Sequence, residues 1–184
     1  MGLFDFFSKK KADGDELLTD VPLEKLKTGY YLDYDMKTWQ VTNAATYNWG
    51  DADISYEWQL TAADDVIYLE LTRDDADEWC ITRKVPFGKL GEAVVSHMKT
   101  NEDPPAEITF DGVTYYQEEM GGGQYINLDK NPESGSELLR WDYCDDSGDR
   151  ILSIEQWGEN DFEAAVGEMV EAYAFTNILP GTLP

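Results

Sequence analysis

Basic residues are scarce in this sequence of 184 residues. It contains 14 lysines and arginines against 38 aspartates and glutamates, which gives a formal net charge of −24 at pH 7. A chain of this charge repels the phosphate groups of nucleic acids and of bare anionic lipids. We therefore expect no binding of DNA or RNA. The acidity favours either simple solubility or a surface that docks a basic partner.

Histidine and cysteine are scarce as well. Cys80 and Cys144 lie far apart, in no spacing typical of a metal site. They fit a reducing compartment, and a disulfide between them stays open. The lone His97 has no nucleophile in a recognisable context, and the acidic stretches 74–78 and 145–149 match hairpin turns better than calcium loops. We expect no catalytic residues, no metal, no cofactor and no enzymatic activity.

Long apolar runs are missing too. No segment approaches the roughly 20 apolar residues that a membrane-spanning helix needs. The N-terminus also lacks the order of charged and apolar regions that defines a signal peptide. The expected location is the cytoplasm, with a contact to the inner membrane face left open.

Residues 1–11 differ in charge from the rest of the chain. Three lysines and one aspartate give them a net charge of +2. The other 173 residues therefore carry a net charge of −26, which makes the total −24. Aromatic rings beside ammonium groups are typical of a weak interfacial membrane anchor. The alternative is that this segment packs on its own domain or takes no fixed structure. The residues predicted to dock to a membrane or a partner are Phe4, Phe6, Phe7, Lys9, Lys10 and Lys11.

The main positive feature is an internal repeat. Tyr34-Asp35 and Thr38-Trp39 recur 76 residues later as Phe110-Asp111 and Thr114-Tyr115. At an offset of 83, the residues Trp58, Leu69, Leu71 and Trp79 correspond to Trp141, Leu152, Ile154 and Phe162. The two offsets differ within a loop, where insertions are tolerated. We predict an N-terminal segment and linker over 1–22, a first β repeat over 23–100 and a second over 101–184, as halves of one compact domain.

Alternating apolar residues predict strands in both halves. Ile54, Tyr56, Trp58 and Leu60 are one example. The predicted fold is mainly β, with duplicated antiparallel units forming a sandwich or an open barrel and one or two short helices. In the first half we predict a strand at Asp33–Val41, a long loop at Thr42–Asp53 and a helix at Phe87–Met98. In the second half we predict a variable loop with a flexible hairpin or bulge at Gly121–Gly123. For Phe162–Tyr173 we predict a strand followed by a helical turn, with a helix as the alternative.

Aromatic residues make up 13% of the chain, and most of them are expected in the core. A surplus would line a groove between the two halves, where a ligand or peptide binds. The candidate groove aromatics are Trp39, Trp49, Trp58, Tyr115 and Trp141.

Several short motifs carry a family resemblance. They are Leu26-Lys27-Thr28-Gly29 leading into Tyr34-Asp35, Tyr56-Glu57-Trp58-Gln59-Leu60, Phe110-Asp111-Gly112-Val113-Thr114-Tyr115, Trp141-Asp142-Tyr143, Leu152-Ser153-Ile154-Glu155-Gln156-Trp157 and the later Gly167. In this order they resemble the bacterial domain-of-unknown-function family 4178 (DUF4178), over roughly residues 24–180. The family has no established activity to carry over. The resemblance implies a genomic context of membrane-stress proteins, small membrane proteins and polyamine-synthesis enzymes.

Three functions follow as hypotheses. The first is a non-enzymatic interaction or adaptor module at the cytoplasmic membrane face, in an envelope-stress or membrane-maintenance system, with a membrane-associated or basic protein as partner. The second is an acidic inhibitor or immunity-type protein that binds a basic enzyme. The third is a protein that binds a polycation such as a polyamine in an acidic, aromatic-lined groove. The oligomeric state stays open.

Overall fold

The computed structural model describes residues 21–73 and 75–183. The first half of this part forms β1 (Tyr31–Tyr34), β2 (Lys37–Gly50), β3 (Asp53–Ala62), β4 (Asp65–Arg73) and β5 (Asp77–Val85). The second half forms β6 (Glu107–Phe110), β7 (Val113–Asn127), β8 (Ser136–Cys144), β9 (Arg150–Gly158), β10 (Asp161–Val170) and β11 (Thr176–Leu179). The helical elements are α1 (Glu92–Asn101) and the 3₁₀ turns η1 (Leu23–Lys25), η2 (Phe87–Leu90) and η3 (Ala172–Ala174).

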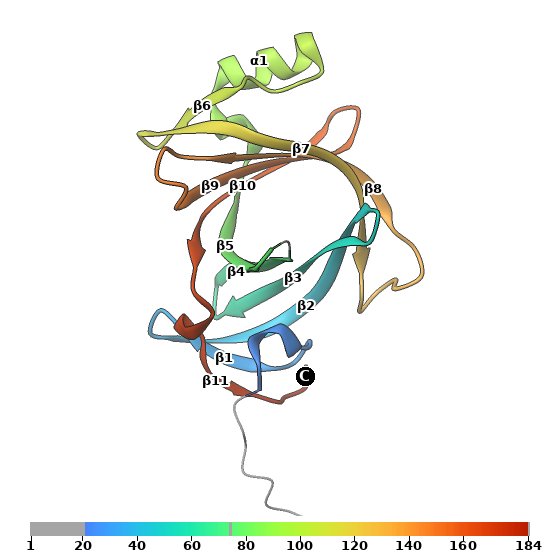
Figure 1. The fold of residues 1–184 in the computed structure, drawn as a ribbon, viewed down its shortest axis with the longest axis vertical. Helices are drawn as coiled ribbons and strands as arrows, with labels where there is room; N and C mark the ends of the chain where they lie inside the picture. Colours follow the sequence, from blue (N-terminus) through green and yellow to red (C-terminus); the bar gives the residue numbers. More distant parts are fainter. Residues whose placement is uncertain (1–20, 74, 184) are drawn as a thin grey trace, which may run out of the picture.

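The strands form one antiparallel sheet that closes into a barrel. Their order is β11-β1-β2-β3-β4-β5-β10-β9-β8-β7-β6, and β2 also pairs with β7. That extra pairing joins β2, β3, β4, β5, β10, β9, β8 and β7 into a closed ring (Figure 1). The prediction of a mainly β fold from duplicated antiparallel units is therefore confirmed, and the barrel is closed rather than open.

The strands β2 and β7 make the closure possible because each serves two neighbours along one edge. The first residues of β2 pair with β1, and residues 45–48 pair with β7. In the same way, β7 pairs first with β6 and then, at residues 124–127, with β2. Each half thus begins with a short strand outside the barrel and continues into a long strand within its wall.

Three local predictions for β1, β2 and β7 are wrong. The expected strand at Asp33–Val41 is a hairpin, because Asp35 and Met36 adopt positive φ angles of 47° and 58° and turn the chain. The expected loop at Thr42–Asp53 is mostly β2, whose polar residues are paired on both sides. Gly121–Gly123 also lies within a strand, β7, and not in a hairpin or loop.

The helical predictions agree with the structure more closely. The stretch Phe87–Met98 forms η2 and then α1, separated at Gly91, whose φ is 108°. The segment after Asn160 is the strand β10 followed by the helical turn η3, which settles the alternative at Phe162–Tyr173 in favour of a strand. No helix in the part of the chain that the structure describes is long and apolar enough to cross a membrane.

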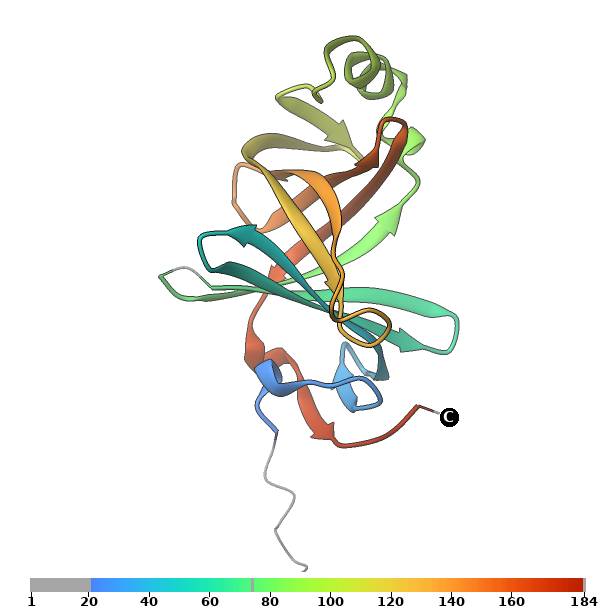
Figure 2. The ribbon, with the colours of Figure 1, turned by 90° about the vertical axis from the view of Figure 1, so that its right-hand side faces the viewer.

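Two hydrophobic clusters lie against the outer face of the barrel wall. The first packs side chains of β1–β5, including Trp58 and Leu69, against η1 and against Phe175 and Ile178 from the C-terminal end. The second packs side chains of β6–β10 against η2 and α1. Figure 1 shows α1 at one end of the molecule and β1 and β11 at the other, and Figure 2 shows the same arrangement from the side. Each half therefore covers its apolar face partly with a segment from the other half.

Candidate functional site

The lumen of the barrel is polar because strand residues alternate between the two faces of the wall. In β4, Ile67, Leu69 and Leu71 belong to the first hydrophobic cluster. The residues between them, Tyr68 and Glu70, line a cavity on the opposite face. Other barrel strands alternate in the same way, and charged side chains from several of them line cavities on the lumen face.

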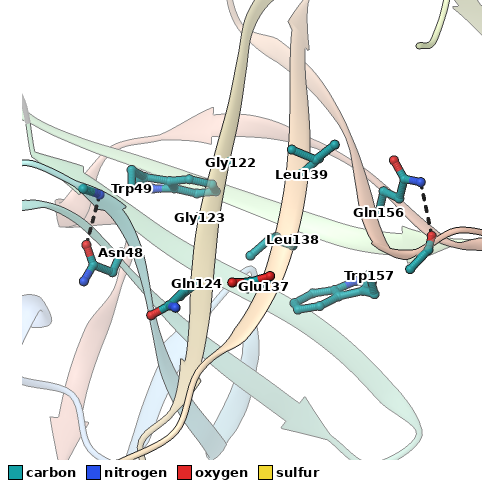
Figure 3. A pocket seen from close by; sticks show the side chains of 12 residues that line it. Asn48, Trp49, Gly122, Gly123, Gln124, Glu137, Leu138, Leu139, Gln156 and Trp157 are labelled. Atoms are coloured by element: carbon teal, nitrogen blue, oxygen red, sulfur yellow. Dashed lines mark hydrogen bonds between the residues drawn. The ribbon is translucent and has the colours of Figure 1, made fainter. Parts of the chain in front are cut away.

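One cavity, of about 690 Å³, lies beside the β7–β8 ribbon (Figure 3). Its walls include the indole rings of Trp49 and Trp157, the side chain of Leu138 and the single carboxylate Glu137. The buried Nε1 of Trp157 has no hydrogen-bond partner among the described residues. With one carboxylate and one free donor, this cavity does not select for ligand charge.

Glycine in β7 makes room for Trp49. A Cβ on Gly123 would lie 2.5 Å from a carbon of the Trp49 ring, whereas a Cβ on Gly122 would meet nothing closer than 3.4 Å. The Trp49 ring stacks on Tyr47 at 5.4 Å between centroids, and its Nε1 donates a 2.8 Å hydrogen bond to Ser55 Oγ. The glycines thus let an aromatic pair stand inside the barrel.

A second cavity, of about 440 Å³, is lined by residues from all eight barrel strands. We call it the acidic mouth. Trp49 and Gly122 line both this cavity and the first one. The ionisable acids of the mouth are Asp53, Glu70, Glu78, Glu119 and Asp142, and its only cation is Arg140.

Arg140 holds the centre of the lumen together. Its guanidinium donates two hydrogen bonds to Glu70, of 2.8 and 3.0 Å, and one of 2.9 Å to Asp142. It also lies 5.5 Å and 5.9 Å from the ring centroids of Tyr47 and Trp49. Burial alone would lower the pKa of Arg140, but the nearby Asp142 and Glu70 raise it above its usual range. Arg140 is thereby paired with two carboxylates.

A third, small cavity of about 20 Å³ is also lined by Glu70 and Arg140. We call it the inner recess. Its lining contains Glu57 from β3 and Glu155 from β9, and the exposed ion pair of Lys84 and Glu163. A cavity of this size holds one water-sized group.

Glu57 and Glu155 converge on one hydroxyl group. The Tyr47 hydroxyl lies 2.9 Å from Glu155 Oε1 and 3.3 Å from Glu57 Oε2. Its proton can be donated to one of the two carboxylates at a time. Within the described residues, neither carboxylate forms a salt bridge, and Glu57 Oε1 and Glu155 Oε2 accept no hydrogen bond. The pair therefore lacks a salt-bridge partner among the described residues.

This environment favours the protonated forms. Burial, followed by the nearby carboxylates of Glu70 and Glu155, raises the pKa of Glu57 to about 8, although the residue is only half-buried. Burial also raises the pKa of Glu155, against the opposing effects of Arg140 and of the hydrogen bond from Tyr47. At pH 7 the protonated form of Glu57 is therefore favoured.

The two cysteines and the histidine lie in different environments. Cys80 is buried, and burial raises the pKa of its thiol well above the usual range. Cys144 is also a free thiol, so the two cysteines do not pair. His97 is on α1, with Nδ1 2.9 Å from the carbonyl oxygen of Asp103. No group of three or more histidine, cysteine or carboxylate side chains among the described residues is placed to hold a metal ion.

The structure places the predicted site residues unevenly. Of the five candidate groove aromatics, Trp49 lines cavities. The other four are buried in the hydrophobic clusters, so the groove prediction is wrong for Trp39, Trp58, Tyr115 and Trp141. Trp58 and Trp141 each follow a lumen residue, Glu57 and Arg140, and belong to the opposite face of the wall. The predicted docking residues Phe4, Phe6, Phe7, Lys9, Lys10 and Lys11 lie outside the described residues.

The lumen residues were missed by sequence reasoning. Glu57, Glu155 and Arg140 each stand next to a core residue, at Trp58, Ile154 and Trp141. A charge alternating with core residues looks like an ordinary solvated strand face. A signal was present nonetheless, because Glu57 lies in one of the family motifs and Glu155 in another. Only the closure of the barrel shows that these faces meet.

Comparisons with known proteins agree on the family and leave the function open. The family model described as a domain of unknown function, DUF4178, matches residues 27–172. An uncharacterized protein of Aquifex aeolicus (strain VF5) is 29% identical over 175 residues, which cover 95% of this chain and 94% of that protein. No solved structure shows significant similarity to the chain. Since the family model covers most of the barrel and both repeats, the chain belongs to the DUF4178 family.

Proposed function

We propose that this chain is a non-enzymatic binding protein whose barrel takes a small organic cation, such as a polyamine. The observation that supports this is the charge of the lumen. Five carboxylates line the acidic mouth and four line the inner recess, and with Glu70 common to both the total is eight. Only two cations, Lys84 and Arg140, face them.

Both lumen cations are already engaged. Arg140 is paired with Glu70 and Asp142, and Lys84 is paired with Glu163. An added cation would therefore meet carboxylates that have no competing partner. The carboxylates of Asp53, Glu78 and Glu119 are exposed, and carboxylates gathered around one opening attract positive charge more strongly than carboxylates spread over the surface.

Aromatic rings add to this preference. Trp49 lines the mouth, and the faces of Trp and Tyr rings attract cations. The absence of a metal-ligating cluster among the described residues favours an organic cation, whose ammonium groups need hydrogen-bond acceptors in place of a tight oxygen shell.

The test is calorimetric titration of the full chain with spermidine at low ionic strength. We expect saturable binding that weakens as salt is added, because screening reduces the attraction. A wild-type protein that gives no saturable heat would contradict the proposal. The variant that probes the site replaces three carboxylates of the acidic mouth: Asp53→Asn, Glu78→Gln and Glu119→Gln.

A matched variant separates the lumen from the general acidity of the chain. It removes the same number of charges at exposed positions, by Asp64→Asn, Glu133→Gln and Glu159→Gln. We expect the mouth variant to bind spermidine at least about tenfold more weakly, a change of about 1.4 kcal/mol, and the surface variant to bind like wild type. Equal weakening by both variants would mean that spermidine only screens the surface.

Two earlier hypotheses stay predictions. Membrane docking by residues 1–11 predicts that a chain lacking them is no longer recovered with membranes or with a membrane-associated partner. Unchanged recovery would remove that hypothesis. An acidic inhibitor predicts tight, salt-sensitive binding to one basic protein, with no dependence on lipid or on residues 1–11.

A further inference from the structure

The inner recess has features that identify the kind of cation it accepts. This step rests on the proposed function and concerns the end group of the ligand. Glu57 and Glu155 face the recess from opposite sides of the barrel, on β3 and β9. Tyr47 lies between them, within hydrogen-bond distance of both. Glu155 is more than nine-tenths buried, and its Oε2 accepts no hydrogen bond within the described part of the chain.

We propose that this recess is the seat of a primary ammonium group, –NH₃⁺, and that filling it releases one proton to solvent. The carboxylates of Glu57 and Glu155 line the recess, and the hydroxyl group of Tyr47 lies within hydrogen-bond distance of both. A primary ammonium group has three N–H donors. A quaternary ammonium group has none, and its methyl groups exceed a cavity of about 20 Å³.

The proton has a defined origin. Before binding, the Glu57 carboxyl group holds a proton. When the ammonium group enters, both carboxylates become ionised and the proton leaves to solvent, so charge and atoms balance. The cation replaces the proton as the partner of the second carboxylate.

The surrounding charges do not supply that partner themselves. Lys84 is bound to Glu163, and its Nζ lies 5.0 Å from the ring centroid of Tyr68. Arg140 faces the pair from β8 but donates its hydrogen bonds to Glu70 and Asp142. The titratable and charged groups around Glu57 are Tyr47 on β2, Tyr68 and Glu70 on β4, Lys84 on β5, Tyr125 on β7, Arg140 on β8, Glu155 on β9 and Glu163 on β10.

The first test compares two ligands of the same length and charge. Hexane-1,6-diamine carries primary ammonium ends, and hexamethonium carries trimethylammonium ends on the same chain. We expect the full-length protein to bind the diamine at least about tenfold more tightly, since the quaternary ends cannot donate hydrogen bonds. Equal affinity would overturn the ammonium seat while leaving the barrel a cation binder. If neither ligand nor spermidine binds, the proposed function itself fails.

The second test counts protons. Titration of the diamine at pH 7 in buffers of different ionisation enthalpy reports the protons released, and we expect about one per site. Glu57→Gln mimics the protonated carboxyl and should bind more weakly with almost no proton release. Glu159→Gln, at an exposed turn, should match wild type in both. Melting of the Glu57→Gln variant at pH 6 confirms that it folds. Tight binding with no proton release in wild type would overturn the proposal.

Discussion

The outer face of the barrel wall and the lumen are built from the same strands, in alternating residues, yet they carry opposite chemistry. On the outer face, large apolar side chains such as Trp141 and Leu69 are completely buried. On the lumen face, Glu57, Glu70 and Glu155 meet around Arg140 and Tyr47. Small closed barrels usually fill their interior with side chains. Here the stabilising cores lie outside the barrel.

Stability is supplied mainly by the outer face of the wall, and we propose that binding takes place in the lumen. Two outer clusters supply the apolar burial that folding needs. The first is covered by η1 and by Phe175 and Ile178, and the second by η2 and α1. The lumen is thereby free to hold groups that oppose stability unless a ligand compensates them. Uncompensated buried carboxylates are unfavourable for folding and favourable for binding a cation.

The largest expected loss of stability comes from a substitution in the outer face of the wall. Trp141→Ala removes a fully buried side chain whose Nε1 donates a 2.7 Å hydrogen bond to Asp103. We expect a loss of about 3–5 kcal/mol in the free energy of unfolding, measured by urea denaturation. Trp49→Ala, on the lumen side, should be clearly less destabilising because that side chain is only partly buried. Equal losses in the two variants would contradict the claim that the outer face supplies most of the stability.

The next effect concerns the charge at the centre of the lumen. Arg140→Met leaves the buried Glu70 unpaired, and we expect a loss of about 3 kcal/mol at pH 7 in the same denaturation experiment. The double variant Glu70→Met with Arg140→Met should recover most of this loss, because no isolated charge remains. A single variant as stable as wild type would show that the lumen is well solvated.

A smaller effect concerns the space for Trp49. Gly123→Ala places a methyl group against the Trp49 ring and should lower the free energy of unfolding by about 1–3 kcal/mol. Gly122→Ala is the matched control, since its Cβ would make only ordinary contacts. The near-ultraviolet circular dichroism of the aromatic pair should change in the first variant alone. A change of the same size in both would mean that Trp49 does not rest on Gly123.

The pH dependence of stability tests the burial of Glu57 in the lumen. The pKa of Glu57 is about 8 in the folded chain and 4.5 as the ordinary value, so the folded state holds the extra proton between these values. Stability must then fall as pH rises through this window, by about 1–3 kcal/mol from pH 6 to pH 9. Glu57→Gln should flatten this decline, and Glu159→Gln should keep it. A wild-type melting temperature that does not fall from pH 6 to pH 9 would contradict the assignment.

Much of the fold could be predicted from the sequence, because alternation and repetition are local signals. The alternating residues around Trp58 gave β3, and the offset to Trp141 gave its counterpart β8. The two long strands could not be predicted in the same way. Polar residues of β2 such as Asn43 and Asn48 resemble a loop until their partners are known, and those partners in β7 lie about 80 residues away.

The site was harder to predict than the fold. The aromatic signal led to Trp58 and Trp141, which are core residues, because apolar bulk alone does not reveal on which face of the wall a ring lies. The carboxylates that matter are indistinguishable in the sequence from the many exposed ones. What sets Glu57 and Glu155 apart is their convergence on Tyr47, a contact across about 100 residues that only tertiary structure creates.

The most direct test of the central claim is the titration of Glu57 itself. Carbon-13 NMR of the side-chain carboxyl groups, with Glu57→Gln to assign the signal, measures its pKa without and with spermidine. The account predicts a midpoint near pH 8 in the free protein and a clearly lower midpoint when spermidine is bound. A Glu57 that titrates near 4.5 and does not respond to spermidine would contradict it.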